Sequence, residues 1–362
     1  MFTLRALPPA GGPLVAGNAL IDTYHGGLRQ HWPRLQLSLA ALLCAMGRGG
    51  WSDSERRLLS DAVRREGLSM ADRKGLHRLL NPGAFPAASC ALRNKLLFAR
   101  HVRDFGLPAA QSWFPDEEPL AEWLEGQSDI IAKPSFQSKG RGVERFRRDG
   151  AAWLDSTTLI ARLEKVARSG GVVQQRVATH PALTPLSPGA LPTLRVMTCI
   201  DEEGRVEPCD LALRLSAGGP RPVDNFNAGN IVAAIDADGR ISRAWQAGQW
   251  GGVDRLELHP TTGATLIGQP LPELDAAIAL AVAAHERFRD GFTVIGWDVG
   301  LSDTGPVLIE GNWNPGSDIL QLVNGRGLAA GRLGALYRHH LTHLPAAQWR
   351  AARAVERDRR RA

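Results

Sequence analysis

Hydrophobic spacing predicts helices in the first quarter of the chain. Across residues 19–80 the apolar positions recur every three or four residues, and no segment alternates apolar with polar residues. Ser52 or Asp53 can cap a helix that runs ERRLLSDAVRREG, and a second helix follows at 70–81. The same spacing predicts a third helix at 91–105, which ends before a Gly-Leu-Pro turn.

Strand patterns dominate after residue 125. Apolar or alternating runs bounded by turn residues predict strands at 129–132, 144–146, 172–177, 193–200, 206–215, 293–301 and 307–310, and a strand pair around 230–241. Helical spacing returns at 153–168 and 274–288. Because the strands do not alternate regularly with helices, the order predicts an α+β fold.

Charge is concentrated at the end of the chain. The 362 residues carry a formal net charge of +6, and the segment 346–362 holds six arginines against one Glu and one Asp. The rest of the chain is therefore nearly balanced. We interpret the tail as a solvated helix end rather than an arm that binds nucleic acid, and we expect no nucleic-acid partner.

The sequence shows no pattern of a membrane or exported protein. Its longest apolar stretch, Leu35–Met46, is far shorter than the roughly 20 residues that span a bilayer. The N-terminus lacks the charge and apolar segment of a signal peptide. The four cysteines form no CxxC pair or Cys/His cluster, so we expect reduced thiols in a cytoplasmic protein without a membrane partner.

Three oxygen-bearing side chains form a candidate metal site. Asp298 and Glu310 fall on two strands joined by a tight turn, and Asn312 follows two residues after Glu310 on the same face. Mg²⁺ prefers such ligands and completes its shell with water and substrate phosphates. The alternative is that these side chains cap a turn.

Basic residues near glycines form a candidate phosphate site. Lys133 directly follows an apolar strand, and the loop Ser135–Gly142 can approach phosphate oxygens with its backbone. The alternative is a solvated hairpin tip, because the GxxxxGK[ST] motif is absent. Arg195 and Arg214 lie near the open end of a predicted hairpin, where they can bind phosphate or carboxylate or serve as surface charges.

Eight segments occur together in an order that resembles the ATP-grasp superfamily. They are Asn94-Lys95, Ile131-Ala-Lys-Pro, Val173-Gln-Gln, Thr193-Leu-Arg, Ala212-Leu-Arg, Asp224-Asn-Phe-Asn-Ala-Gly-Asn, Gly296-Trp-Asp and Ile309-Glu-Gly-Asn. More narrowly, the chain resembles the sugar-transfer-associated ATP-grasp group and the alpha-L-glutamate ligase-like proteins. The resemblance covers about 91–322.

The resemblance implies a division of the chain. A helical N-terminal region at 1–90 would precede an ATP-grasp domain at 91–345, and 346–362 would form the basic tail. Two α+β lobes, at about 91–178 and 190–330, would clamp ATP. Many relatives carry a Rossmann-like domain where this chain has helices. The helical region could cover the acceptor site, form a homodimer or dock a partner enzyme, and the sequence leaves these roles open.

The resemblance also implies residue roles. Lys95 and Lys133 would contact the ATP phosphates, together with the loop residues Ser135, Ser138, Lys139, Gly140 and Gly142. The adenine and ribose would lie against Gln174, Gln175 and Val177, with Asn225 and Asn227 on the floor of the site. One or two Mg²⁺ ions would be held by Asp298, Glu310 and Asn312, and the catalytic cations would be Arg195, Arg214 and Lys133.

The implied reaction is ATP-dependent ligation of a small-molecule carboxylate to an amine through an acylphosphate, with release of ADP and phosphate. The setting would be glycoconjugate or secondary-metabolite biosynthesis. The first alternative is a kinase that phosphorylates a hydroxyl, since it needs the same site. The second is a non-catalytic protein that binds nucleotide or nucleic acid.

Overall fold

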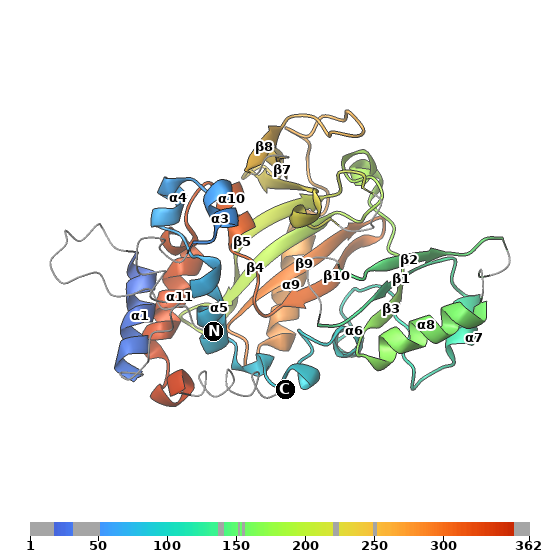
Figure 1. The fold of residues 1–362 in the computed structure, drawn as a ribbon, viewed down its shortest axis with the longest axis horizontal. Helices are drawn as coiled ribbons and strands as arrows, with labels where there is room; N and C mark the ends of the chain where they lie inside the picture. The colour runs from blue at the N-terminus through green and yellow to red at the C-terminus, as the bar shows by residue number, and fades with distance from the viewer. Residues whose placement is uncertain are drawn as a thin grey trace.

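The computed structural model describes residues 18–31, 51–136, 141–150, 153, 156–219, 224–248 and 252–350, and it contains two antiparallel sheets (Figure 1). The smaller sheet has the order β2-β1-β3, with β1 (Asp129–Lys133), β2 (Glu144–Arg147) and β3 (Val172–Gln175). The larger sheet has the order β10-β9-β4-β5-β6-β7-β8. Its strands are β4 (Thr193–Ile200), β5 (Val206–Leu215), β6 (Ile231–Ile235), β7 (Ile241–Ala247), β8 (Val253–Leu256), β9 (Val294–Ser302) and β10 (Gly305–Asn312).

The described part of the first 90 residues is helical, as the spacing predicts, but one predicted helix is broken. The segment after Ser52 forms α3 (Asp53–Leu58) and α4 (Asp61–Arg65) instead of one continuous helix. The cause is local: Leu59 is extended and the side chain of Ser60 accepts a hydrogen bond from the Val63 backbone, which starts a new helix. The other helices are α1 (Ala19–His31) and α5 (Met70–Leu80).

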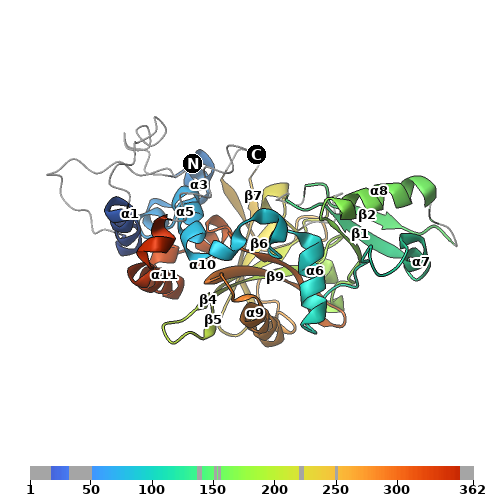
Figure 2. The same cartoon turned by 90° about the horizontal axis from the view of Figure 1, so that it is seen from below.

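Helices cover both faces of the larger sheet. On one face lie α6 (Lys95–Asp104) and α9 (Leu274–Phe288), and on the other lie α1, α5, α10 (Asp318–Asn324) and α11 (Arg332–His343) (Figure 2). Strand β6 shows the alternation directly: Ile231 and Ala233 belong to the core that contains α9, whereas Val232 and Ala234 belong to the core that contains α10 and the N-terminal helices. Helix α6 corresponds to the helix predicted at 91–105. It begins at Lys95, four residues later than the spacing predicts, because the Asn94 side chain caps it.

The smaller sheet has its own hydrophobic core. The helices α7 (Leu120–Glu125) and α8 (Ser156–Arg168) pack on it through Trp123, Leu163 and their apolar neighbours. In Figure 1 this unit lies to the right of the larger sheet. The N-terminal helices lie at the opposite end of the larger sheet, on the left.

Two segments connect the two sheets. Residues 108–113 contact both, since Leu308 N donates to Pro108 O at 2.8 Å and Trp113 N donates to Val173 O at 3.0 Å. Residues 176–180 leave β3 and reach β9, where His180 N donates to Leu301 O at 3.0 Å. The space between the sheets is thus bounded by two chain crossings.

Within the described residues, no helix is long and apolar enough to cross a membrane. The stretch Leu35–Met46 and the tail beyond residue 350 lie outside the described residues.

Candidate active site

A cleft of about 1130 Å³ lies between the two sheets and continues to the N-terminal helices. It is larger than the ~300–1,000 Å³ typical of one small-molecule pocket. Twelve of the predicted site residues line it: Lys95, Lys133, Gln174, Gln175, Val177, Arg195, Arg214, Asn225, Asn227, Asp298, Glu310 and Asn312. The fold therefore gathers residues that lie more than 200 positions apart in the sequence.

Two arginines share one buried carboxylate at the centre of the cleft. Asp298 Oδ2 accepts from Arg195 Nη2 at 3.0 Å and from Arg214 Nη1 at 2.9 Å, and Asp298 Oδ1 accepts from Arg195 Nε. Arg214 Nη2 also donates to Asp224 Oδ1 at 2.7 Å, and the other oxygen of Asp224 accepts from the Thr193 hydroxyl. Asp298 is 4% exposed, so the guanidinium groups are aligned by a carboxylate shielded from water.

The strand register explains this cluster. Arg195 on β4 lies directly opposite Asp298 on β9, and Arg214 on β5 lies opposite Thr193 on β4. Burial by itself disfavours a charged guanidinium, but Asp224 and Asp298 raise the pKa of Arg214. Arg214 therefore remains a cation at any physiological pH.

A second ion pair joins α6 to β10. Lys95 Nζ lies 2.8 Å from Glu310 Oε2, and Lys95 is the first residue of α6, where the Asn94 side chain caps the helix. Lys95 holds the pKa of Glu310 well below its usual range, and Glu310 in turn raises the pKa of Lys95. The two side chains are thus a fixed charge pair beside the Arg195, Arg214 and Asp298 cluster.

A β-bulge places Glu310 in the cleft. Leu308 pairs with Val299 and both are in the core, so regular alternation would put Glu310 in the core as well. The register shifts between Leu308 and Glu310, and Glu310 lies opposite Asp298. One extra residue in β10 therefore turns the Glu310 side chain to the cleft face.

Lys133 ends β1 on the opposite side of the cleft. Burial and the nearby Lys95 lower the pKa of Lys133 to about 8, against the opposing influence of Glu310. Its amine is therefore charged at neutral pH but close to titration. A polyphosphate in the cleft would favour the charged form.

Ser135 positions Lys95 and does not line the cleft. Its hydroxyl accepts from Lys95 N at 2.7 Å and donates to Gly170 O. Gly170 O also accepts from Leu96 N at 3.0 Å, which fixes the start of α6 against the smaller sheet. In this structure the Ser135 hydroxyl makes both contacts within the protein, and its contact with phosphate stays a prediction.

The other predicted nucleotide residues lie along one wall and the floor. Gln174 Nε2 donates to Ser112 Oγ at 2.9 Å, while Gln175 is exposed and Val177 is half-buried at the cleft. On the floor, Asn225 Oδ1 accepts from Asn227 N at 3.0 Å and caps a short turn.

Part of the predicted phosphate loop lies outside the described residues, namely Ser138, Lys139 and Gly140. Gly142 is described but does not line the cleft. Phe136, at the start of the loop, has a φ of 61° and is 55% exposed at the mouth of the cleft. A bulky residue with positive φ is uncommon and indicates local backbone strain.

The fit of Mg²⁺ differs among the three predicted ligands. One carboxylate oxygen of Glu310 accepts a hydrogen bond from Lys95 Nζ. The amide N–H of Asn312 donates to Gly296 O at 3.2 Å, so the side-chain oxygen of Asn312 takes no part in that hydrogen bond. Asp298 already accepts three hydrogen bonds from arginines. In the described part of the chain, no group of three or more His, Cys, Asp or Glu side chains is placed to hold a metal ion. Glu310 and Asn312 therefore each keep one side-chain oxygen that could hold Mg²⁺, whereas every side-chain hydrogen bond that Asp298 accepts within the described residues comes from an arginine.

Two charged residues that line the cleft, Asp224 and Arg73, were not among the predicted site residues. Asp224 anchors Arg214, and its place at the head of the segment DNFNAGN is the signal that could have identified it. Arg73 on α5 also lines the cleft, but no local pattern in the sequence connects that helix to the site.

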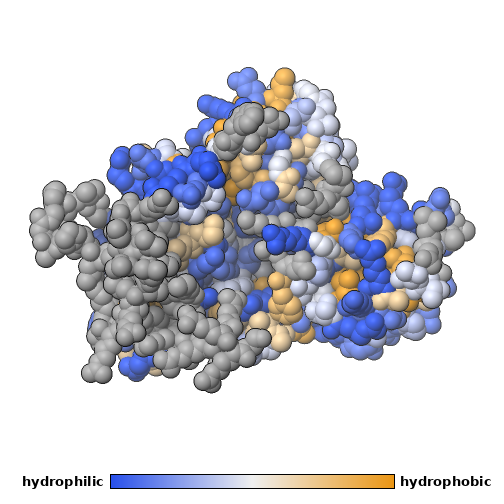
Figure 3. Space-filling view, in the orientation of Figure 1, coloured by the Kyte–Doolittle hydropathy of each residue, from blue (hydrophilic) through white to orange (hydrophobic). Residues whose placement is uncertain are grey.

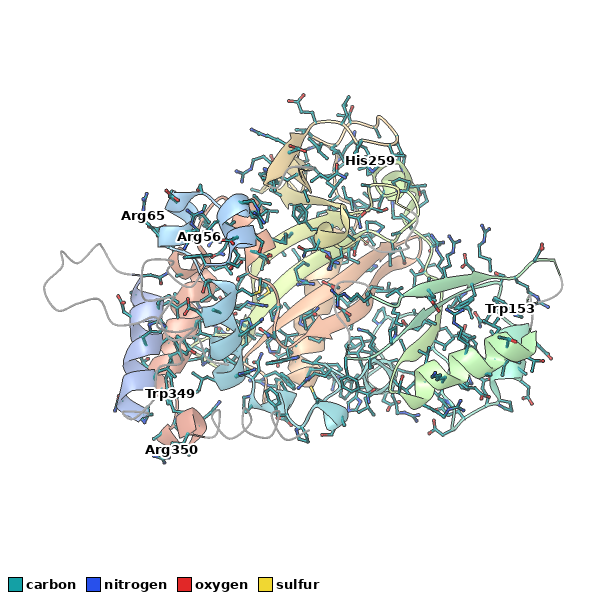
Figure 4. The ribbon with its side chains drawn as sticks, in the orientation of Figure 1. Arg56, Arg65, Trp153, His259, Trp349 and Arg350 are labelled. Atoms are coloured by element: carbon teal, nitrogen blue, oxygen red, sulfur yellow. The ribbon has the colours of Figure 1, made fainter. Side chains whose placement is uncertain are left out.

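Histidine and cysteine side chains do not contribute to this cleft among the described residues. His259 lies in a turn beyond β8 (Figure 4), where its ring nitrogens bond Ser216 O, Thr261 N and Thr262 N. Cys199 is buried in the core, and burial raises the pKa of its thiol.

Comparison with known proteins assigns the fold. A family model for the sugar-transfer associated ATP-grasp proteins matches residues 86–335, and no curated protein matches the chain. Among solved structures, D-alanyl-alanine synthetase A from Vibrio cholerae is 14% identical, with 72% of this chain and 67% of that one covered and a TM-score of 0.42. The L-amino acid ligase from Bacillus licheniformis is 15% identical, with 69% and 48% covered and a TM-score of 0.39.

A third structure, N5-carboxyaminoimidazole ribonucleotide synthetase from Thermotoga maritima, is 12% identical, with 76% and 56% covered and a TM-score of 0.40. The chain spans about half the length of the second and third structures. The family match covers well over half of the chain, and the chain therefore belongs to the sugar-transfer associated ATP-grasp family, with the ATP-grasp fold and N-terminal helical region that the sequence predicts.

Proposed function

We propose that the protein is an ATP-dependent ligase that joins a carboxylate to an amine through an acylphosphate. The observation that carries the proposal is the set of cations fixed in one cleft: Lys95 on Glu310, and Arg195 and Arg214 on Asp298. Phosphoryl transfer asks a protein mainly to position its reactants and to neutralise charge.

The cations have distinct places in the proposed reaction. Lys95, at the start of α6, and Lys133, at the end of β1, both line the cleft and would bind the ATP phosphates. Arg195 and Arg214 would face the γ-phosphate and the attacking carboxylate, so that the charge of the transferred group is neutralised as its bond to ADP breaks. The carboxylate gains the phosphoryl group, and the amine then displaces phosphate.

Mg²⁺, when bound, would supply positive charge that offsets the charge of the phosphate groups. Glu310 and Asn312 would hold it, with Asp298 as the third candidate ligand. The bulge in β10 supports this role of Glu310, since it turns the carboxylate into the cleft.

No nucleophilic side chain is required in this reaction, because the substrate carboxylate itself attacks the γ-phosphate. Covalent catalysis by the enzyme is therefore not part of the proposal.

The test is product analysis with purified protein, MgATP and panels of acids and amines. We expect ADP and phosphate to form only when acid and amine are both present, and hydroxylamine to trap the acylphosphate as a hydroxamate. AMP as the nucleotide product would contradict the proposal. A phosphorylated product stable to hydroxylamine would instead identify a kinase.

A further inference from the structure

Three polar side chains of the N-terminal region form a buried stripe along α5. Arg73 and His77 lie on the helix at a spacing of four residues, which places them on one side of it, and Asn81, four residues further on, caps its C-terminal end. All three are at most 8% exposed. The polar side chains of α3 and α4, by contrast, give those helices a strongly hydrophilic outer surface (Figure 3). We call the three residues the α5 stripe.

The stripe binds the short segment 313–315, which directly follows the candidate metal ligand Asn312. Asn81 Nδ2 donates to Trp313 O at 2.6 Å, and Arg73 Nη1 donates to the carbonyl oxygens of the next two residues at 2.7 and 2.5 Å. Three consecutive backbone acceptors are thus satisfied by side chains of the stripe, because the segment lies between β10 and α10 and belongs to neither.

His77 adds a contact to a side chain of the segment and is held in turn by α11. Its Nδ1 lies 3.0 Å from Asn314 Oδ1, and its Nε2 lies 2.8 Å from the Tyr337 hydroxyl. Burial and the nearby Arg73 lower the pKa of His77 to about 3, so the ring is neutral and carries one proton. The geometry fits a ring whose Nδ1–H donates to Asn314 and whose Nε2 accepts from Tyr337.

The segment 313–315 is also packed against β9, the strand that carries Asp298. A Cβ atom on Gly296 of β9 would lie 2.4 Å from Pro315 Cβ, so only glycine allows this close approach. The carbonyl of the same Gly296 accepts from the Asn312 side chain at 3.2 Å. Asn312 is therefore fixed by Gly296 through its side chain and by the α5 stripe through the backbone that follows it.

The α5 stripe is a costly way to hold two elements together. The Nε of Arg73 is buried without a hydrogen-bond partner among the described residues, which reduces stability. Apolar side chains of similar size often stabilise such a contact at least as well as buried charged groups do. Stability alone therefore does not explain why polar groups occupy this side of the helix.

We propose that Arg73, His77 and Asn81 are positioning residues that hold Asn312 in place for the metal ion. The inference rests on the proposed function, because that function assigns Glu310 and Asn312 to Mg²⁺. Groups that orient metal ligands change metal affinity by roughly 10–100-fold when they are replaced. The N-terminal region would thus act on the site through the backbone that follows β10.

The test compares two variants of His77, which is not among the residues that line the cleft. His77→Gln can keep the contact with Tyr337 but removes the donor to Asn314, whereas His77→Asn keeps a donor near the position of Nδ1 and loses the contact with Tyr337. Each variant thus loses one buried hydrogen bond. The full-length proteins are titrated with β,γ-methylene-ATP in excess Mg²⁺ and in EDTA, and the ratio of the two dissociation constants measures the gain in affinity due to Mg²⁺.

We expect this gain in the wild type and in His77→Asn, and a gain about tenfold smaller in His77→Gln. The dissociation constants in EDTA should agree within twofold among the three proteins. In the nucleotide-free proteins, hydrogen exchange of residues 312–318 should be faster in His77→Gln than in His77→Asn.

A role in stability alone would lower the melting temperature of His77→Gln and leave its gain due to Mg²⁺ equal to that of the wild type, and this result would overturn the inference. If His77→Gln does not fold, Arg73→Met replaces it, because methionine is long and apolar and removes both hydrogen bonds to the segment. A gain in Arg73→Met equal to that of the wild type would likewise overturn the inference.

The wild type separates this inference from the proposed function. If the wild type binds no nucleotide, or gains no affinity from Mg²⁺, the proposed function fails and the inference falls with it. If the wild type shows the gain and the variants of the stripe show the same gain, the inference about the α5 stripe fails alone.

Discussion

Replacing Glu310 with glutamine separates the two roles that this residue has in the cleft. In the free protein Glu310 pairs with Lys95, and in the proposed complex it holds Mg²⁺. Glu310→Gln keeps the size of the side chain and removes its charge. We therefore expect a small loss of stability in the free protein and a large loss of the magnesium-dependent response to nucleotide.

The size of the first effect follows from the geometry. At 2.8 Å and an effective dielectric constant of 20, the attraction between Lys95 and Glu310 is about 6 kcal/mol before solvation is counted. Their side chains are 22% and 35% exposed, so desolvation and solvent screening remove most of this attraction. A net cost of about 1 kcal/mol remains, which corresponds to roughly 2–4 °C in melting temperature.

The second effect is measured by thermal unfolding with β,γ-methylene-ATP, with and without Mg²⁺. A ligand at about 100 times its Kd stabilises the folded state by about 2.7 kcal/mol, or roughly 5–10 °C. We expect this magnesium-dependent shift in the wild type and its loss in Glu310→Gln. The control is Glu117→Gln, which breaks an exposed pair with Arg103 far from the cleft and leaves the shift unchanged.

A full magnesium-dependent shift in Glu310→Gln would refute the assignment of Glu310 as a metal ligand. A fall in melting temperature of more than 10 °C in the free variant would refute the estimate of solvent screening, and would show that the pair with Lys95 is a major structural contact.

Three further predictions follow from the same cluster. The amine of Lys133 has a pKa of about 8 and is charged below that pH. Nucleotide affinity of the wild type should therefore fall as the pH rises through about 8, as measured by binding titrations from about pH 6.5 to 9.5. Lys133→Arg should remove this fall, because arginine stays charged over that range. Asp298→Asn leaves the side chains of Arg195 and Arg214, which are only 16% and 12% exposed, with one remaining carboxylate. Urea unfolding should show a loss of about 3–5 kcal/mol, whereas a loss below about 1 kcal/mol would contradict the burial argument. Ser135→Ala removes a hydroxyl that bonds both Lys95 N and Gly170 O, and should cost about 1–3 kcal/mol in the same assay; an unchanged unfolding midpoint would show that water replaces it.

Sequence patterns predicted the hairpin of the larger sheet well because both of its strands carry their own signal. Thr193–Ile200 and Val206–Leu215 alternate around a Glu-Glu-Gly turn, and the structure confirms both ranges. Arg195 and Arg214 lie on neighbouring strands as predicted, and the opposing Asp298 is set by the pairing of β4 with β9.

The parts that were missed depend on contacts between distant segments or on single backbone irregularities. The leucines at 58 and 59 fit one helix, and only the competing cap at Ser60 divides it. The bulge before Glu310 leaves no trace in an alternation pattern. Helices α10 and α11 were not predicted, nor was β8, and α11 is fixed by packing against α1 from the other end of the chain. Trp349, which stacks on Tyr24 and His31, closes that contact (Figure 4).

Asp298 and Asp224 pair with the two arginines at the centre of the cleft, and this pairing has a consequence for ligand binding. Buried guanidinium groups without partners would be costly, so Asp298 and Asp224 keep Arg214 charged and oriented before any substrate arrives. A polyphosphate could accept the hydrogen bonds that Arg195 and Arg214 now donate to Asp298. The carboxylate of Asp298, which lies opposite Glu310 on the neighbouring strand, would then be free of the arginines. The same exchange that binds phosphate would thus complete the set of metal ligands. Nucleotide and Mg²⁺ should therefore bind with positive coupling, each more tightly in the presence of the other.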